Sequence, residues 1–235
     1  MHIATTTYLL ATAALSLLAC SDDATPAIDA PDVPTDAAID AAGCGSDFLF
    51  TGAYVDWDST TSAFSGVFES MWTLPGPPPR TVLTNPNGRV ELCIPPSGVS
   101  LLTATRADYL PAVFVAEPDV FESPGLFFFS TKGLKTARAA SFYTSIGLTF
   151  DATKAHVLVE KQHAAISLSL TGGGAAFAVD NPDDLTWAPG TSGGVVLFAN
   201  VDPAGGEGAL SSSSSFVGPA SLPLRAGTLT LLTIR

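Results

Sequence analysis

Short apolar stretches, separated by Gly, Pro, Asn and Ser, recur along most of the chain from residue 47 onward. Candidate strands lie at residues 47–56, 66–74, 80–84, 89–94, 99–106, 112–116, 156–161, 166–170, 175–179, 193–201 and 229–234. Spacing of about 8–12 residues between short strands is typical of a sandwich or barrel. Asn87 and Gly88 add a strong hairpin signal, because both residue types tolerate a positive φ. The pattern predicts an all-β fold.

Two features between residues 119 and 151 interrupt this pattern. Residues 126–129 form an apolar run that is too short to cross a membrane and is bounded by Pro-Gly and Lys-Gly, which predicts a buried strand. Residues 134–146 carry small and apolar side chains at loosely helical spacing, and Gly147 follows as a candidate cap. The sequence therefore predicts two β-sandwich modules, at residues 46–118 and 152–235, joined by a connector with a short helix. One elongated domain is the alternative.

The N-terminus carries a different apolar run. Residues 8–19 are too few to span a bilayer as a helix, which takes about 20 residues. A run of this length followed by polar residues is typical of the hydrophobic region of a signal peptide, which we place at residues 1–19. The run ends in Leu17, Leu18, Ala19 and Cys20, and Ser21 follows. An ordinary signal peptide with an incidental cysteine, or a buried core segment, is the alternative.

The sequence from Leu17 to Cys20 resembles the lipobox of bacterial lipoproteins. The resemblance implies cleavage before Cys20, a diacylglyceryl group on its sulfur and acylation of the new amine. Two or more acyl chains give stable membrane anchoring. In enteric-type lipoproteins an Asp directly after the cysteine favours inner-membrane retention. Ser21 stands there in this chain, so the resemblance favours a place in the cell envelope at the outer membrane rather than the inner one.

Residues 20–45 are dominated by Asp, Ala and Pro and contain no aromatic residue. Such a segment buries too little apolar surface to offset its ordering entropy, so we expect a disordered, extended tether. A calcium site is the alternative here, but the acidic residues do not follow the spacing of an EF-hand loop.

The whole chain is acidic, with 10 Lys and Arg against 22 Asp and Glu and a formal net charge of −12. This balance argues against nucleic-acid binding, which needs clustered cations, and against electrostatic docking on anionic lipid.

With Cys20 acylated, two cysteines remain, Cys44 and Cys93. Disulfides persist in exported proteins, so the sequence favours a bridge between them over two buried thiols.

Residues 84–92 and 99–111 carry a second resemblance, to the carboxypeptidase regulatory-like, or transthyretin-like, domain. That family has a Thr-x-x-x-Gly-Arg-hydrophobic strand, a Pro/Gly turn, a Val/Leu/Thr strand and a Gly-Tyr-x-Pro turn, where this chain has Asp108 before Tyr109. Residues 193–201 resemble the family's Gly-x-hydrophobic-x-Phe-x-Asn-Val strand. The resemblance implies two small Greek-key sandwiches without an active site that act as spacers or binding platforms.

The sequence contains no HExxH, paired CxxC, GxSxG, Walker or strand-linked GxGxxG motif. His156 and His163 lie seven residues apart around a predicted strand, which places them on opposite faces and counts against a shared metal. A Ser–His–Asp site would have to use one of them, and no serine has the context of a nucleophile elbow. We therefore predict no catalytic site, no metal and no cofactor.

Two loops nevertheless gather polar and aromatic side chains. They contain Asp56, Trp57 and Asp58, and Asp180, Asn181, Asp183 and Asp184. These residue types bind calcium, or a sugar beside Trp57 or Trp187, but at strand ends they more often cap the backbone in Asx-turns.

The sequence thus predicts a non-catalytic envelope lipoprotein with a structural or protein-binding role. It binds the membrane through its lipid, and its other partner is an unidentified envelope protein or glycan. A carbohydrate- or calcium-binding surface module is the alternative.

Overall fold

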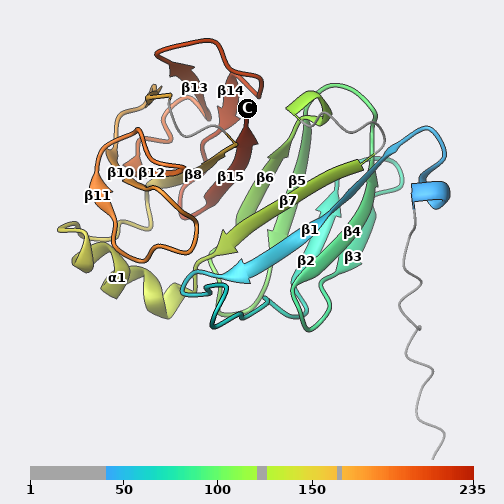
Figure 1. Cartoon of the computed structure of the whole chain (residues 1–235), viewed down its shortest axis with the longest axis horizontal. Coiled ribbons are helices and arrows are strands. Elements are labelled where there is room, and N and C mark those ends of the chain that lie inside the picture. Colours follow the sequence, from blue (N-terminus) through green and yellow to red (C-terminus); the bar gives the residue numbers. More distant parts are fainter. Residues whose placement is uncertain (1–40, 121–125, 163–165) are drawn as a thin grey trace, which may run out of the picture. The chain divides into compact units, whose positions relative to one another are not determined.

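Strands make up most of the structure, a computed structural model that describes residues 41–120, 126–162 and 166–235. Within these residues there is one α-helix, α1 (Thr136–Ser145), and two 3-10 turns, η1 (Ala41–Cys44) and η2 (Pro118–Val120). The predicted all-β class with a short helix is confirmed (Figure 1). The predicted signal peptide, the lipobox, most of the tether and His163 lie outside the described residues.

Fifteen strands are found in the described part of the chain. Those of the first half are β1 (Phe48–Asp56), β2 (Met71–Leu74), β3 (Arg80–Leu83), β4 (Arg89–Ile94), β5 (Ser100–Thr105), β6 (Ala112–Ala116) and β7 (Leu126–Gly133). Those of the second half are β8 (Ala155–Lys161), β9 (Leu168–Leu170), β10 (Ala175–Val179), β11 (Ala188–Pro189), β12 (Val195–Val201), β13 (Glu207–Ser212), β14 (Ser221–Pro223) and β15 (Leu229–Ile234).

A single central sheet contains strands from both halves, in the order β11-β10-β12-β8-β15-β6-β5-β2-β3. The last strand, β15, pairs in parallel with β8 on one side and with β6 on the other. The described residues also belong to one compact unit. The prediction of two separate sandwich modules is therefore not fully confirmed, because the backbone of β15 joins the two halves into one sheet.

Each face of the central sheet has its own core. Successive side chains of a strand point to opposite faces, and β15 follows this rule. Leu229 and Leu231 lie in a core with residues of β1, β4, β7 and α1, on what we call face A. Leu232 and Ile234 lie in a second core with residues of β9, β13 and β14, on what we call face B. Burial on both faces explains why residues 229–234 carry no charge and combine four apolar residues with two threonines.

Two three-stranded sheets provide the covers of these cores. The sheet β4-β1-β7 lies over face A, and the sheet β14-β13-β9 lies over face B. Beneath the first cover, the rings of Phe50 and Phe129 stack with centroids 4.3 Å apart, and Phe114 and the fully buried Trp72 complete the cluster. Gly52 permits this packing, since a Cβ there would lie 2.0 Å from the carbonyl oxygen of Phe129.

Helix α1 ends as the sequence predicts. Gly147 adopts a φ of +77°, and its N–H donates to the carbonyl of Thr144 over 3.1 Å. The N–H of Leu148 reaches back to the carbonyl of Tyr143 over 2.8 Å, which completes a Schellman motif. The helix buries Ala139, Phe142 and Tyr143 against the face A core. No helix of the described residues is long and apolar enough to cross a membrane.

Candidate functional site

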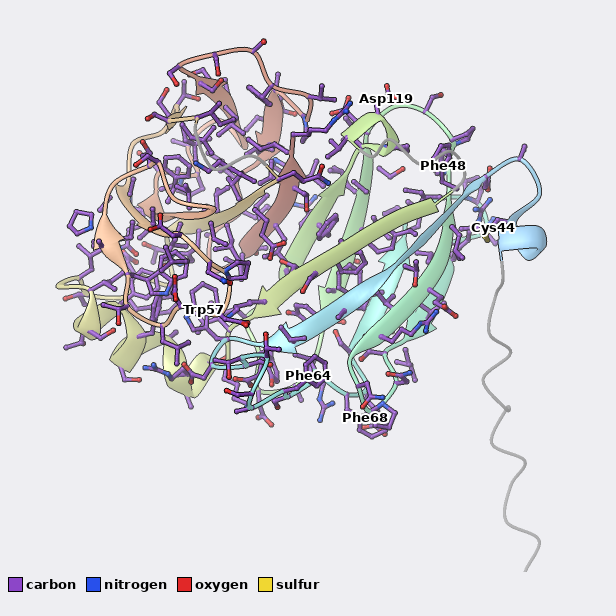
Figure 2. All side chains as sticks on the ribbon, in the orientation of Figure 1. Cys44, Phe48, Trp57, Phe64, Phe68 and Asp119 are labelled. Carbon is purple, nitrogen blue, oxygen red and sulfur yellow. A yellow bond between two sulfur atoms is a disulfide. The ribbon has the colours of Figure 1, made fainter. Side chains whose placement is uncertain are left out.

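The two loops that the sequence analysis singled out lie against each other. The loop after β1 contains Thr61, whose hydroxyl donates to the carboxylate of Asp183 in the loop after β10. The rings of Trp57 and Trp187 stack, with centroids 5.7 Å apart and an interplanar angle of 17°. Figure 2 places Trp57 at the far end of β1 from Cys44 and Phe48. The fold thus brings residues about 120 positions apart into one cluster.

The carboxylate of Asp56 has two strong partners. It accepts a hydrogen bond of 2.6 Å from the Tyr109 hydroxyl, and the ammonium of Lys135 lies 2.6 Å away. The N–H of Asp58 also donates to it over 3.2 Å. Burial alone would raise the pKa of Asp56, but the hydrogen bonds from Lys135, Tyr109 and Asp58 outweigh burial and hold this pKa below its usual value. Asp56 therefore serves to fix the end of β1.

Asp58 is held by the helix. The guanidinium of Arg138 on α1 donates to both of its carboxylate oxygens, over 2.8 Å from Nε and 3.2 Å from a terminal nitrogen. This bidentate geometry orients the loop on α1. Both side chains are partly exposed, so solvent screens the pair and its contribution to stability is at most about 1 kcal/mol.

A buried lysine also binds the backbone of the loop after β1. Lys132 of β7 is 8% exposed, and its Nζ donates to the backbone carbonyls of Trp57 and Ser59 over 3.1 Å each. Burial lowers the pKa of Lys132, and the charges of Asp183 and Glu160 oppose that shift. No sequence pattern pointed to Lys132, because a lone lysine in a strand is normally exposed.

The side chains of the second loop bond mainly within the loop. The amide oxygen of Asn181 accepts from the N–H of Asp183 over 3.0 Å, and Asp184 accepts from the N–H of Asn181 over 3.1 Å. Asp180 and Asp184 are exposed. Within the described residues no group of three or more His, Cys, Asp and Glu side chains is arranged to hold a metal ion.

The two tryptophans of the cluster are largely covered. Trp57 is 2% exposed and packs its ring against Phe142 at a centroid distance of 4.8 Å. Trp187 is half-buried and contacts both rings. A sugar stacks on an aromatic face that is open to solvent, and Trp57 offers no such face.

The structure joins Cys44 and Cys93 in a disulfide, with their Cα atoms 5.4 Å apart. The bond ties η1 to β4, which pairs along its length with β1. Beside it, Arg80 donates to Asp47 over 2.6 Å and to the carbonyl of Cys93 over 2.7 Å. A shallow hollow of about 380 Å³ lies between these residues and Val82.

His156 is fully buried beneath α1. Its Nδ1 is hydrogen-bonded to the hydroxyl of Tyr143 over 2.5 Å, and Phe150 stacks on its ring at 4.9 Å. Burial lowers the pKa of His156 to about 4, so the ring is neutral at physiological pH. A tyrosine occupies the position at which a Ser–His–Asp site would need a carboxylate. The histidine is thus a core residue of the helix contact.

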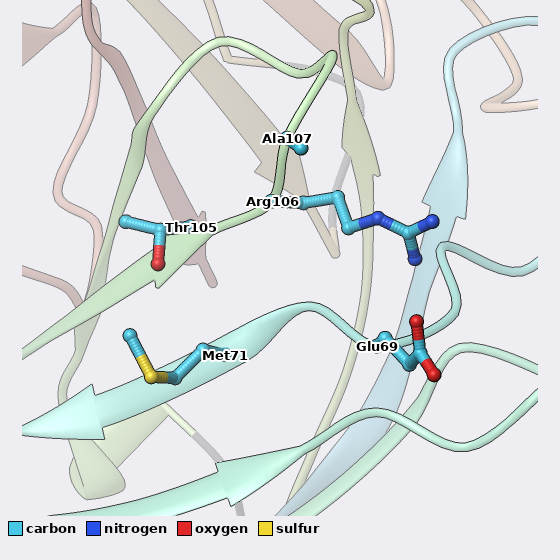
Figure 3. Close-up of a pocket in the computed structure, with 5 residues that line it drawn as sticks. All are labelled: Glu69, Met71, Thr105, Arg106 and Ala107. Carbon is cyan, nitrogen blue, oxygen red and sulfur yellow. The ribbon is translucent and has the colours of Figure 1, made fainter.

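A second hollow, which no sequence pattern indicated, opens beside the start of β2 and the end of β5. It has a volume of about 540 Å³ and is lined by Glu69, Met71, Thr105, Arg106 and Ala107. Figure 3 shows Met71 and Thr105 on neighbouring strands, with the charged ends of Glu69 and Arg106 reaching toward each other beside them. Met71 is 45% exposed at this hollow.

No protein-family model and no curated protein matches the chain. Several solved structures are loosely similar. The TIE protein of Bacillus anthracis is 10% identical with a TM-score of 0.28, over 80% of this chain and 34% of its own. This chain thus spans about a third of that protein. The shaft pilin SpaA of Lactobacillus rhamnosus GG is 12% identical with a TM-score of 0.27, over 80% of this chain and 96% of its own.

The minor pilin GBS52 of Streptococcus agalactiae is similar at the same level, with 11% identity and a TM-score of 0.25 over 79% of this chain and 94% of its own. TM-scores of this size carry no conclusion about activity or partners, so the function of the chain is argued from its own residues.

Proposed function

We propose that the protein is a non-catalytic lipoprotein of the cell envelope with a structural, protein-binding role. Its anchor would be the acylated Cys20, and residues 20–45 would be the spacer to the folded domain. The lipobox residues, the apolar run before them and a disulfide between Cys44 and Cys93 support this proposal, since disulfides persist outside the cytoplasm. Ser21 after the cysteine supports the outer membrane over the inner one.

One observation carries the choice of protein binding over calcium or glycan binding. In the loop after β1, the carboxylates and the indole that would serve a calcium ion or a sugar already have partners within the molecule, Asp56 with Lys135, Asp58 with Arg138 and Trp57 with Phe142. Apolar side chains are meanwhile exposed on strands, as at Met71 and Leu83. Exposed apolar groups that cluster on a rigid surface indicate a contact with another macromolecule.

The carboxypeptidase regulatory-like family remains our proposal for the first half of the chain. The family's Gly-Arg strand corresponds to β4, and its turn is organised by Asn85, whose amide oxygen accepts from the N–H groups of Asn87 and Arg89 over 3.0 Å each. Gly88 adopts a φ of +70° in this turn, a conformation that favours glycine. These features support the resemblance, and with it a platform rather than an enzyme.

Intact mass of the protein extracted from membranes of its native cells tests the anchor. We expect a chain that begins at Cys20 and carries acyl groups, and we expect Cys20→Ala to lose the acyl mass and leave the membrane fraction. Cys93→Ser is the matched control, because it removes a sulfur from the folded domain and should keep the lipid. A wild-type mass with Met1 retained and no lipid would overturn the anchor and the envelope location.

A further inference from the structure

The disulfide lies on the outer side of its strand. Successive side chains of β4 alternate between the core and the outside. Leu92 and Ile94 are 2% and 0% exposed and belong to the face A core, whereas Cys93 between them is half-buried and points outward. Its partner Cys44 is also half-buried, and both cysteines line the hollow of about 380 Å³. The bond therefore lies at the surface of the folded protein and not in its core.

A cation stands beside one of the two cysteines. Arg80 lines the same hollow, and its guanidinium donates to the carbonyl of Cys93 over 2.7 Å. A nearby guanidinium stabilises a thiolate. Asp47 accepts from the same guanidinium over 2.6 Å and offsets part of this effect, but it is the only carboxylate among the described residues that line the hollow. The sulfur of Cys93 is thus the better leaving group of the two.

We propose that this bond is a redox switch, which a dithiol reductant opens on the folded protein and which loosens the edge strand β4 when it opens. The first thiolate of the dithiol attacks Sγ of Cys44, and the electron pair of the broken S–S bond leaves on Cys93 beside Arg80. The second thiolate attacks the reductant sulfur of this mixed disulfide and releases Cys44. The two protons of the dithiol end on the two cysteines, and the reductant becomes a disulfide.

The bond closes one end of the β1–β4 pair. Phe48 lies opposite Ile94 and Leu49 opposite Cys93 in the register of this pair, and Figure 2 shows Cys44 and Phe48 at this end. In the sheet of the described residues β4 is an edge strand, with β1 as its one hydrogen-bonded neighbour. Once the bond opens, only noncovalent contacts hold this end, so β4 separates from β1 more readily there.

The rest of the fold does not depend on the bond. The bond spans 49 residues, which include β1, β2, β3 and most of β4. Strands β8, β12 and β15 lie beyond this loop and pair with one another in the central sheet. We therefore expect the opened protein to stay folded, with the greatest change at the β1–β4 end.

The switch stands where the proposed tether meets the domain. With the bond closed, the chain before Cys44 is joined covalently to β4 as well as to β1, and with the bond open it is joined to β1 alone. A dithiol would thus change how firmly the anchor holds the domain. This last step rests on the proposed function, whereas the opening of the bond does not.

Reduction by dithiothreitol at about pH 8 tests the opening. The chain carrying Cys20→Ala is used, because Cys44 and Cys93 are then its only cysteines. Alkylation of samples taken over time, followed by mass spectrometry, gives the rate. We expect this rate to be nearly independent of urea below the unfolding transition. Reduction that required global unfolding would instead accelerate at least about fivefold per molar urea, because urea exposes the chain in proportion to its concentration.

The arginine tests the direction of attack. Arg80→Gln should slow reduction about two- to fivefold, because the leaving thiolate loses its cation, and Arg80→Lys should keep most of the rate. Arg89→Gln is the matched control, since Arg89 is an exposed arginine at the other end of β4 and pairs with Glu91. It should leave the rate unchanged.

Hydrogen exchange of the oxidised and reduced proteins tests the consequence. Amides at the Phe48–Ile94 end should gain at least about tenfold more in exchange rate than amides of β12, which report the loss of global stability. Equal gains in both places would overturn the proposal, as would a steep urea dependence of reduction or equal effects of Arg80→Gln and Arg89→Gln. Acylation of Cys20 in native cells, together with a bond that dithiothreitol opens only after unfolding, would leave the envelope role intact and refute only the switch.

Discussion

The carboxylate of Asp56 lies 2.6 Å from the ammonium of Lys135 and accepts a second hydrogen bond of 2.6 Å from Tyr109. These contacts join the end of β1 to the residue that precedes α1 and to the turn after β5. The Asp56 side chain is 10% exposed, whereas Lys135 is 48% exposed, so the hydrogen bond to Tyr109 and the burial of Asp56 matter more than the screened ion pair. Asp56 is the centre of this network.

Asp56→Asn should therefore lower the free energy of unfolding by about 1–3 kcal/mol at pH 7, since hydrogen bonds to a charged group are lost. The pKa of Asp56 is lowered on folding from 3.8, so its contribution is present above pH 3.8 and is lost as the pH falls below that value. Urea unfolding at pH 7 and pH 3 measures both effects. The gap between wild type and variant should narrow at pH 3, and Asp58→Asn, at an exposed pair, should cost less at pH 7.

His156 predicts a second, separate pH dependence. Its pKa falls from 6.5 to about 4 on folding, because burial disfavours the charged ring. The unfolded chain then binds a proton more readily than the folded one, so stability is lost as the pH falls from about 6.5 to about 4. The loss is on the order of 3 kcal/mol.

Unfolding free energies measured at intervals between pH 7 and pH 4 test this, with His156→Gln as the comparison. The variant should be less stable at pH 7, and the wild type should lose on the order of 3 kcal/mol more stability than the variant across this range. Tyr143→Phe removes the hydroxyl that bonds Nδ1 and keeps the ring, so it should retain most of the slope. Equal slopes in wild type and His156→Gln would assign the acid sensitivity to other groups.

The disulfide gives a third prediction. Cys44 and Cys93 are 49 residues apart, and closing a loop of that length stabilises a fold by about 2–4 kcal/mol. Cys44→Ser with Cys93→Ser should therefore lower the unfolding free energy by about this amount. Mass spectrometry after alkylation in denaturant without reductant should find neither sulfur modified. Labelling of both in the unreduced protein would contradict the bond.

The sequence predicted the strands better than their partners. Short apolar stretches at residues 156–161 and 229–234 predicted strands, but they did not reveal that β15 would lie between β8 and β6, because pairing depends on contacts distant in sequence. Two modules were therefore the natural prediction from a local pattern. The Schellman end of α1 was predictable, since Gly147 acts on its own helix.

Contacts distant in sequence also limited what could be predicted of the candidate site. The acidic residues at strand ends were visible in the sequence, and so were the aromatic ones. Their partners were not, because Tyr109 is 53 positions from Asp56 and Arg138 is 80 positions from Asp58. Lys132 could not be recognised from the sequence, because a lysine in a strand is normally solvent-exposed.

Calcium provides the last prediction and tests the alternative function directly. The oxygens that a calcium ion would need at Asp56 and Asp58 accept from Lys135, Tyr109 and Arg138. Addition of 10 mM calcium, about 1,000 times a dissociation constant of 10 μM, would stabilise a binding-competent fold by about 4 kcal/mol. We expect instead that calcium changes the melting temperature by less than about 1 °C, and that magnesium does the same.

The double variant Lys135→Ala with Arg138→Ala frees both carboxylates. A calcium-dependent rise in melting temperature confined to that variant would identify these cations as the groups that exclude the ion. A rise of several degrees in the wild type would instead support a calcium-binding module.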